Sequence, residues 1–331
     1  MLVGGIGTRL RPLTFTIPKQ MLPVVDVPML ERKIAHLVDH GIDDIVLSMG
    51  YRPDAFREAY PDNRCSGARL QYVVESEPLG TAGAIAFAAR HAGITGTFLA
   101  FNGDVLTDLR IHDLLAMHNG SGAEGTVSLT PVADPSRFGV VPTDDQGRVQ
   151  AFIEKPSPGE APTNLINAGS YVLEPSFLDR VTPHVQVSIE REIFPQMVEE
   201  STLYAGAFDD YWLDIGTPES YLQANLDLLD AEFDGQSFIA GTAQVGMADC
   251  RRSVIGRECT VSDSATVIDS VLLPGASVDD GAVVERSVVG EHSRVGSKAS
   301  LRNLTVVGGN CNVGNGAVLD GERVNPENVS A

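Results

Sequence analysis

A glycine-rich loop near the start of the sequence carries the strongest chemical signal. Residues 4–14 read GGIGTRLRPLT, with three glycines in the first four positions. Glycine allows a sharp turn and a close approach to a ligand, so successive backbone N–H groups can converge on phosphate oxygens. Arg9 in the loop and Lys19 after it supply the fixed positive charge that stabilises a departing polyphosphate. The loop predicts a phosphate site, the alternative being an ordinary glycine turn beside surface cations.

Two widespread phosphate-binding motifs do not fit this loop. It lacks the lysine and hydroxyl residue that end the GxxxxGK[ST] motif. Leu10 stands where the dinucleotide-binding fingerprint has its third glycine. The phosphate chemistry must therefore be supported by the residues around the loop.

Two aspartates are candidates for holding a divalent metal. Asp104 and Asp214 each stand at the end of a short apolar run. Carboxylate oxygens are the hard ligands that Mg²⁺ prefers. Aspartate is also a common helix cap or turn residue, so spacing alone leaves the role of both open.

Strands and helices must alternate over the first part of the chain to position these residues. Apolar runs over 42–50, 70–75 and 96–104 predict strands, and the patterns over 28–40, 80–92, 111–119 and 218–232 predict helices. We therefore predict an α/β domain with a Rossmann-like mixed, mostly parallel sheet and helices on both faces. Ligands of such sheets bind at the carboxyl ends of the strands, where these motifs fall.

The last 90 or so residues have a different composition and a repeat. All the aromatic residues precede Ile239, and apolar residues then recur every six positions, as at Ile255, Val261 and Val267, with phase slips up to Val318. This period favours a left-handed parallel β-helix built from hexapeptide repeats over an ordinary Val-rich β domain. We predict a catalytic domain over 1–232, a linker over 233–240 and the β-helix over 241–331.

Charge and cysteine content limit the classes of partner. With 24 Lys and Arg against 44 Asp and Glu, the net charge is −20, which argues against a nucleic-acid partner. The apolar runs are too short to cross a membrane, and we expect no signal peptide before the first motif. No zinc spacing connects the cysteines, so we expect reduced thiols in a cytoplasmic protein. They are Cys65, Cys250, Cys259 and Cys311.

The motifs together resemble the signature of the sugar-nucleotide pyrophosphorylases, a family of nucleotidyltransferases, over nearly the whole chain. The glycine loop and PKQMLP over 18–23 resemble the family's signature, and ESEPLGTAG over 75–83 is similar to its base-recognition loop. VSIEREIFP over 187–195 is similar to a segment of the mannose-1-phosphate guanylyltransferases. Further segments that resemble family motifs are NGD at 102–104, FGVV at 138–141, EKP at 154–156, NAG at 167–169 and WLDIG at 212–216.

The resemblance implies that GTP and mannose 1-phosphate react to give GDP-mannose and pyrophosphate, with Mg²⁺ as cofactor. It implies catalytic roles for Arg9 on the departing phosphates, for Lys19 between the two substrates, and for Asp104 and Asp214 as metal ligands. The implied sugar-phosphate contacts are Gly139, Glu154, Lys155 and Asn167. The implied nucleotide contacts are Val3, Gly4, Gly5, Gly7, Thr8, Arg9, Glu75, Leu79, Gly80 and Thr81.

Glu75 offers a physical argument for guanine. Guanine presents two adjacent donors, N1–H and N2–H₂, and a carboxylate can accept a hydrogen bond from each. Thymine and uracil present only one donor on that edge. A strand-end Glu75 facing solvent is the alternative.

Several alternatives stay open from the sequence. A related enzyme could use glucose 1-phosphate with dTTP, UTP or ATP, and a non-catalytic homologue could sense sugar nucleotides. An acyltransferase would need a catalytic histidine in the repeat, where His292 is the only one. We expect a homo-oligomer, because an open β-helix end invites pairing. Only Met1, Leu2 and Val3 precede the loop, so either the first central strand is short or the true start lies upstream.

Overall fold

The computed structural model describes residues 1–50 and 52–326. The chain divides into two compact units. The first unit comprises Met1–Gly5 and Lys33–Trp212, and the second comprises Ile6–Arg32 and the chain from Leu213 onward. Helix α1 (Met29–Asp39) runs from the second unit into the first.

The first unit has a mixed sheet architecture. Strand β3 pairs in parallel with β5, β8 pairs in parallel with β12, and β11 pairs antiparallel with β6, β8 and β9. Leu2 makes parallel bridges to both Ser48 and Asn102, so the start of the chain lies between two strands. The strands are β3 (Asp44–Met49), β4 (Arg64–Cys65), β5 (Ala68–Val74), β6 (Phe98–Phe101), β7 (Val105–Thr107), β8 (Gly125–Pro131), β9 (Gly139–Val140), β10 (Ile153–Glu154), β11 (Leu165–Leu173) and β12 (Leu203–Ala207).

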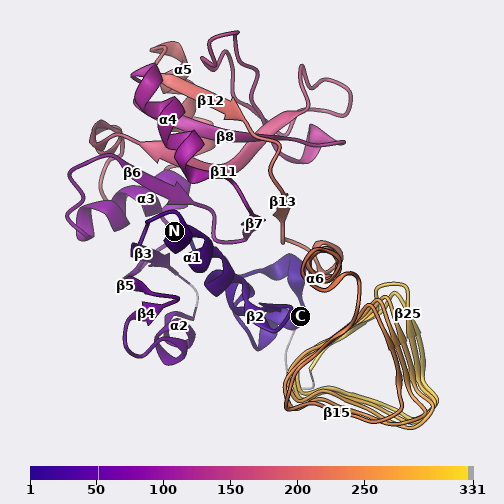
Figure 1. Ribbon diagram of the computed structural model, residues 1–331. Coiled ribbons are helices and arrows are strands. Elements are labelled where there is room, and N and C mark those ends of the chain that lie inside the picture. The colour runs from indigo at the N-terminus through magenta and orange to yellow at the C-terminus, as the bar shows by residue number, and fades with distance from the viewer. Residues whose placement is uncertain (51, 327–331) are drawn as a thin grey trace. The chain divides into compact units, whose positions relative to one another are not determined.

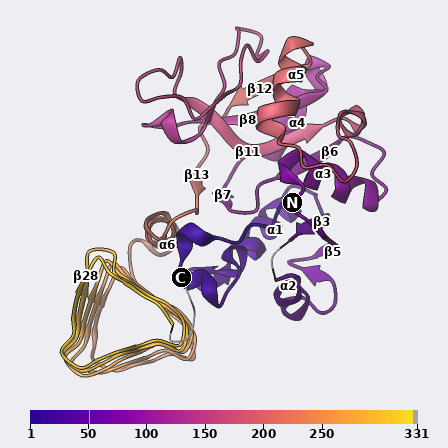
Figure 2. The ribbon, with the colours of Figure 1, turned by 180° about the vertical axis from the view of Figure 1, so that it is seen from behind.

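Helices cover these strands and bury an aromatic-rich core. Helix α3 packs against β3, and α4 packs against β8 and β12, as the reverse view also shows for α4 (Figure 2). The core includes Tyr171, Phe177 and Phe194, all almost fully buried. The helices are α2 (Pro53–Ala59), α3 (Gly80–His91), α4 (Ile111–Ser121) and α5 (Phe194–Glu199). The predicted strands at 42–50, 70–75 and 96–104 and the predicted helices are confirmed.

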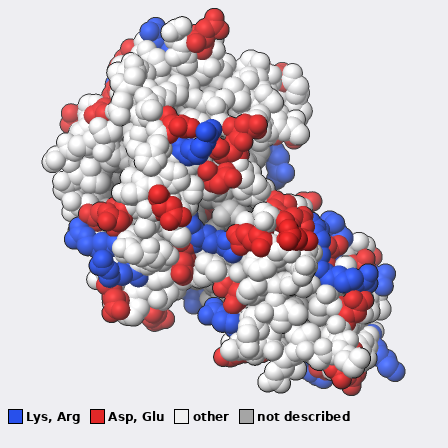
Figure 3. All heavy atoms as spheres, in the orientation of Figure 1, with Lys and Arg blue, Asp and Glu red and all other residues white. Residues whose placement is uncertain are grey.

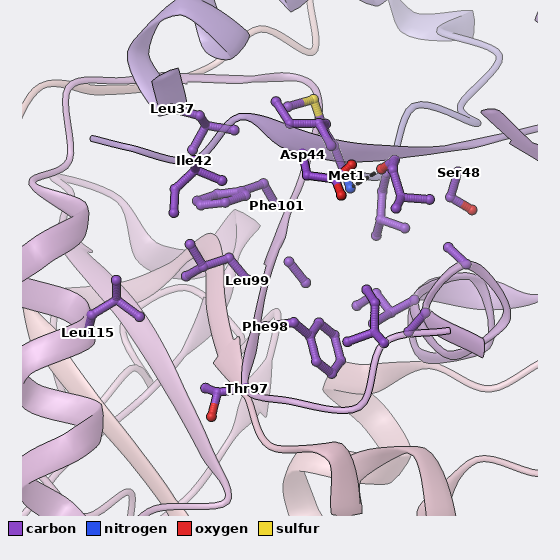
Figure 4. A pocket seen from close by; sticks show the side chains of 18 of the residues that line it. Met1, Leu37, Ile42, Asp44, Ser48, Thr97, Phe98, Leu99, Phe101 and Leu115 are labelled. Carbon is purple, nitrogen blue, oxygen red and sulfur yellow. Dashed lines mark hydrogen bonds between the residues drawn. The ribbon is translucent and has the colours of Figure 1, made fainter. Parts of the chain in front are cut away.

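An apolar cavity of about 550 Å³ lies in the first unit between β3 and β6. Side chains of Ile42, Leu99 and Leu115 line it (Figure 4). The amino group of Met1 donates to the carbonyl of Val46 at 2.8 Å, and burial lowers its pKa to about 5. None of the predicted site residues lines this cavity.

The second unit is built on a three-sided solenoid of parallel strands, which agrees with the predicted left-handed β-helix (Figure 1). Successive strands of one side pair at offsets of 16 to 18 residues, as in Phe238 with Val254 and Val288 with Val306. A coil with three sides of six residues each would give an offset of 18 residues. The coils with offsets of 16 or 17 residues therefore explain the phase slips in the sequence repeat. The core is aliphatic, with Val267, Val284 and Leu301 fully buried.

The sides of the solenoid are three sheets, and the first coil begins at Phe238, inside the segment expected to be the linker. The first sheet is β14 (Phe238–Ile239), β17 (Val254–Ile255), β20 (Val271–Leu272), β23 (Val288–Val289), β26 (Val306–Val307) and β29 (Arg323–Val324). The second is β15 (Gln244–Val245), β18 (Thr260–Val261), β21 (Ser277–Val278), β24 (Arg294–Val295) and β27 (Asn312–Val313). The third is β16 (Asp249–Arg251), β19 (Thr266–Ile268), β22 (Val283–Glu285), β25 (Ser300–Arg302) and β28 (Val318–Asp320).

The segment that carries the end of the glycine loop also belongs to the second unit. It contains the hairpin of β1 (Pro23–Val24) and β2 (Val27–Pro28), and the side chain of Asn225 in α6 (Pro218–Phe233) accepts from the N–H of Val25 at 2.9 Å. Tyr221 in the same helix donates to the Pro23 carbonyl. The chain passes from the first unit to the second within strand β13 (Trp212–Asp214). The hairpin that follows the glycine loop therefore packs on helix α6.

The surface agrees with the acidic composition. On the face in Figure 3, Lys and Arg are interspersed with Asp and Glu, and they form no continuous basic stripe there. No helix in residues 1–50 and 52–326 is both long enough and apolar enough to cross a membrane. All four cysteines are free thiols.

Candidate functional site

The end of the glycine loop folds back toward Lys19 in the second unit. Gly7 has φ +70°, and it precedes a 3₁₀ turn over Thr8–Leu10. A Cβ on Gly7 would lie 3.1 Å from a methyl carbon of Thr14 and 3.2 Å from Cβ of Lys19. The Thr14 hydroxyl donates to the Gly7 carbonyl at 2.8 Å. Backbone conformation and space therefore both favour glycine here, and the turn places Thr8 and Arg9 beside the Lys19 segment.

Arg9 and Asp214 approach the same glycine in the second unit. A Cβ on Gly216 would lie 2.7 Å from Nη2 of Arg9 and 3.1 Å from Oδ1 of Asp214. Gly216 is buried, whereas Arg9 is exposed. The small residue thus lets a guanidinium and a carboxylate share one surface, one suited to phosphate oxygens and the other to a metal.

In the first unit, Asp104 lies in a turn that is held by backbone contacts on both sides. Asn102 N–H donates to Gly169 O at 2.8 Å, and Gly103 N–H donates to Leu2 O at 2.9 Å. A Cβ on Gly103 would lie only 2.5 Å from Leu2 O, so a larger residue does not fit. The half-buried Asp104 is thereby fixed at the end of β6.

Val3 and the first two glycines of the loop, Gly4 and Gly5, also belong to the first unit. Val3 is fully buried, and its N–H donates to Ser48 O at 2.8 Å. A Cβ on Gly4 would lie 3.1 Å from the backbone nitrogen of Gly50. The loop start is therefore anchored along β3.

The carboxylate of Glu75 closes the loop that was expected to read the base. Its Oε1 accepts from the Ser48 hydroxyl at 2.9 Å, and its Oε2 accepts from the Leu79 N–H at 3.2 Å. Each carboxylate oxygen has a further lone pair, so a guanine contact is compatible with these bonds. The base contact of Glu75 stays a prediction.

The base loop and the 187–195 segment meet in the first unit. Gly80 has φ +71°, and a Cβ there would lie 2.5 Å from the Val187 carbonyl. Thr81 donates to Oε2 of Glu190 at 2.7 Å, and it accepts from the Ile189 N–H at 2.8 Å. Two segments about a hundred residues apart in the sequence thus pack against each other.

Two of the expected sugar-phosphate contacts are paired across β9 and β10. Gly139 is opposite Glu154, and a Cβ on Gly139 would lie 3.1 Å from Glu154 Oε2 and 2.7 Å from the Phe152 ring. Lys155 is exposed, with Nζ 3.6 Å from Glu154 Oε1. The absence of a side chain at Gly139 leaves the carboxylate of Glu154 open to a ligand.

Asn167 lies at an irregularity of β11 and holds a buried tyrosine. Its Oδ1 accepts from Gly169 N–H, and its Nδ2 donates to the Tyr171 hydroxyl, both at 2.9 Å. Burial raises the pKa of Tyr171, so the hydroxyl stays neutral. Nearby negative charges raise its pKa further; they belong to Glu190, Glu154 and Asp104.

The predicted site residues therefore fall into two groups according to the unit to which each belongs. In the described part of the chain, no cluster of three or more His, Cys, Asp or Glu has the arrangement of a metal site. The first group is Val3, Gly4, Gly5, Glu75, Leu79, Gly80, Thr81, Asp104, Gly139, Glu154, Lys155 and Asn167. The second group is Gly7, Thr8, Arg9, Lys19 and Asp214.

Sequence reasoning missed several residues of these groups. Ser48 and Tyr171 are buried partners of predicted site residues, and nothing in their local sequence marks them. Glu190 lies in the 187–195 segment, whose resemblance was noted without a role for this side chain. Gly216 ends the WLDIG segment, and its position two residues after Asp214 was the available signal.

Comparisons with known proteins identify the family of this chain. The family model described as nucleotidyl transferase matches residues 1–231, and the one described as GMPPB C-terminal domain matches residues 233–329. A mannose-1-phosphate guanylyltransferase from Mycobacterium tuberculosis is 41% identical over 231 residues, which cover 69% of this chain and 64% of that protein. A mannose-1-phosphate guanyltransferase from Schizosaccharomyces pombe is 41% identical over 226 residues, 67% of this chain and 61% of that protein.

A solved structure is also similar. The crystal structure of HddC from Yersinia pseudotuberculosis matches with a TM-score of 0.59 and 30% identity, covering 69% of this chain and 97% of that one. HddC was also solved as a complex with GMP-PN, which matches at 29% identity and a TM-score of 0.58. The matched part of this chain spans a little under two thirds of the length of both curated relatives, at 64% and 61%. The nucleotidyl transferase model covers residues 1–231, which are most of this chain. The chain therefore belongs to the nucleotidyl transferase family.

Proposed function

We propose that this protein transfers a guanylyl group from GTP to mannose 1-phosphate, giving GDP-mannose and pyrophosphate. The approach of Arg9 and Asp214 to Gly216 supports the reaction class, because a guanidinium there could bind phosphate oxygens and a carboxylate there could bind a metal ion. The choice of base and sugar is supported by the relatives named mannose-1-phosphate guanylyltransferase and by the 75–83 and 187–195 segments.

The reaction needs positioning and charge neutralisation more than proton transfer. An oxygen of the sugar phosphate forms a bond to the α-phosphorus in line, and the bond from that phosphorus to the bridging oxygen breaks. Pyrophosphate leaves with the electron pair. The attacking oxygen is ionised at pH 7, so no general base is required. Arg9 would bind the departing phosphates, Lys19 would lie between the two substrates, and Lys155 would bind the sugar phosphate.

Mg²⁺ is the proposed cofactor, and the side chains present fit it. Asp104 and Asp214 offer hard oxygen ligands, and Mg²⁺ commonly needs only one or two carboxylates beside water and substrate phosphates. When bound, the ion would neutralise phosphate charge. The two carboxylates would hold it, and the backbone contacts around Asp104 would keep that ligand in place.

The remaining assignments follow from the same site. Glu154 and Asn167 would accept from or donate to sugar hydroxyls, and Gly139 would let the backbone approach the sugar. Backbone N–H groups around the glycine loop, with Thr8, Leu79, Gly80 and Thr81, would contact the nucleotide. We also propose a cytoplasmic homo-oligomer, with the 1–232 region as catalytic domain, 233–240 as linker and 241–331 as a β-helix domain.

A screen of pyrophosphate release tests the function directly. Purified protein with Mg²⁺ is assayed with GTP, ATP, dTTP and UTP, each against mannose 1-phosphate and glucose 1-phosphate. We expect the highest kcat/KM for GTP with mannose 1-phosphate. Preferential turnover of glucose 1-phosphate with another nucleotide would assign the alternative enzyme. Binding of GDP-mannose without any turnover would assign a sensor.

A further inference from the structure

A buried lysine supports the turn that carries Asp104. Lys33 lies on α1, on the same face as Leu30, Ile34 and Leu37, all of which are buried. Only 5% of Lys33 is exposed. An ammonium group in such an apolar stripe is costly unless it is hydrogen-bonded, so its partners identify what it does there.

Those partners are the two carbonyls on either side of Asp104. Nζ of Lys33 donates to Asn102 O at 2.8 Å and to Val105 O at 3.1 Å. It also lies 5.3 Å from the centre of the Phe101 ring. Burial lowers the pKa of Lys33 to about 8, and the negative charge of Asp104 opposes that shift.

The other contacts of the turn use different atoms. The N–H groups of Asn102 and Gly103 donate to Gly169 and Leu2, so these bonds leave the carbonyls of the turn for Lys33. One ammonium group thus bonds both Asn102 and Val105, which flank the candidate metal ligand Asp104. Removing it leaves two carbonyls of a buried turn without this donor.

We propose that Lys33 is a positioning residue that holds the Asn102–Val105 turn, and with it the carboxylate of Asp104, in the geometry needed for nucleotidyl transfer. The catalytic part of this inference rests on the proposed function. The alternative is a lysine that merely fills space, in which case an apolar side chain of similar length would serve as well.

The test compares Lys33→Met, which removes the donors and the charge, with Lys33→Gln, which keeps N–H donors on a shorter side chain. Lys298→Met is the matched control, because Lys298 is exposed on the solenoid. Backbone hydrogen exchange is measured on the protein without substrate, in a peptide covering residues 101–106. Kinetic constants are measured with GTP, mannose 1-phosphate and Mg²⁺.

We expect roughly tenfold faster exchange of the 101–106 peptide in Lys33→Met, with peptides from β8 and β11 unchanged. We expect kcat to fall about tenfold while each KM changes less than about threefold, because positioning of a metal ligand acts mainly in the transition state. Lys33→Gln should fall between wild type and Lys33→Met, and Lys298→Met should match wild type.

Three results would overturn the inference. They are unchanged exchange at 101–106, acceleration spread evenly over the first unit, and accelerated local exchange without a fall in kcat. If the wild-type protein transfers no nucleotidyl group, the proposed function fails. The exchange comparison still decides whether Lys33 holds the turn.

Discussion

At the scale of single residues, the candidate site is shaped as much by missing side chains as by charged ones. At Gly103 a Cβ would lie 2.5 Å from Leu2 O, and at Gly216 it would lie 2.7 Å from Nη2 of Arg9, so both positions favour glycine. The two candidate metal ligands are thus each associated with a glycine.

Both candidate metal ligands should be essential. Asp104→Ala and Asp214→Ala should each lower kcat roughly 1,000-fold or more, because a lost metal carboxylate costs several kcal/mol of transition-state stabilisation. Circular dichroism should show an intact fold. Asp108→Ala, at an exposed aspartate four residues after Asp104, should keep full activity. Near-normal turnover in either ligand variant would reject the two-carboxylate site.

Glu75→Gln tests how the base is selected. The substitution replaces one acceptor oxygen with an NH₂ donor, so a guanine donor would face another donor. An unpaired buried polar group costs about 1–3 kcal/mol, so kcat/KM with GTP should fall roughly 5- to 150-fold. ATP presents an acceptor at N1, so the GTP/ATP ratio should fall as well.

The bonds from Glu75 to Ser48 and Leu79 suggest the control measurement. If Glu75 only closes the loop, the substitution should weaken GTP and ATP use equally and leave their ratio unchanged. Glu77→Gln, at an exposed position in the same loop, should affect neither. An unchanged ratio would leave guanine selection to backbone groups near Leu79.

Residues of this kind show what the sequence could and could not predict. Arg9, Lys19 and Asp104 stand in short motifs, so their types and neighbours suggested a role. Lys33 and Glu190 have partners 69 and 109 residues away in the chain. Their contacts depend on how strands and helices pack, which local spacing does not encode. For Lys33, the position of a lysine on an apolar helix stripe was the usable signal, and for Glu190 it was the resemblance of the 187–195 segment.

At the scale of elements, alternating strands and helices predicted the fold class but not every strand direction. Parallel neighbours need a crossover, usually a helix. Between β8 and β11 the chain forms the short strands β9 and β10 and no α-helix, and β11 returns antiparallel to β8. The contact between the base loop and the 187–195 segment likewise depends on the packing of segments that are distant in the sequence.

The solenoid contains a ladder of three buried serines in successive coils, Ser253, Ser270 and Ser287. The hydroxyl of Ser270 donates to Ile268 O at 2.6 Å. The same hydroxyl oxygen accepts from the Ser287 N–H at 3.1 Å. The Ser270 N–H in turn donates to the Ser253 hydroxyl at 3.1 Å. The hydroxyls of Ser253 and Ser270 therefore each satisfy a backbone N–H of the next coil, where a methyl group would leave that N–H buried and unpaired.

Ser270→Ala should destabilise the solenoid. We expect a loss of about 1–3 kcal/mol of unfolding free energy, because a buried donor loses its acceptor. Chemical denaturation followed by circular dichroism measures it. Ser277→Ala, at a half-exposed serine of β21, serves as control and should change stability by less than about 0.5 kcal/mol. Equal effects of the two substitutions would show that the ladder contributes nothing specific.

At the scale of the whole molecule, the solenoid leaves sheet edges at its ends. Strand β28 pairs with β25, and it is the last strand of its sheet within residues 1–50 and 52–326. Val318 on this strand is 74% exposed. Exposed apolar side chains at a strand edge favour pairing with another chain. These features support association of two copies through the end of the solenoid.

Val318→Lys tests the proposed homo-oligomer and its interface together. A charge on an edge strand opposes pairing, so the variant should be monomeric at micromolar concentration, where the wild-type protein should associate. Light scattering after size exclusion gives both masses. Val185→Lys makes the same change at a valine of the first unit that is 46% exposed, and it should leave the mass unchanged.

A monomeric wild-type protein would refute the oligomer. An associated Val318→Lys variant would move the interface away from this end. Because the predicted site residues lie outside the last coil, Val318→Lys should keep the kcat of the wild-type protein, and a large loss of kcat would mean that assembly supports catalysis.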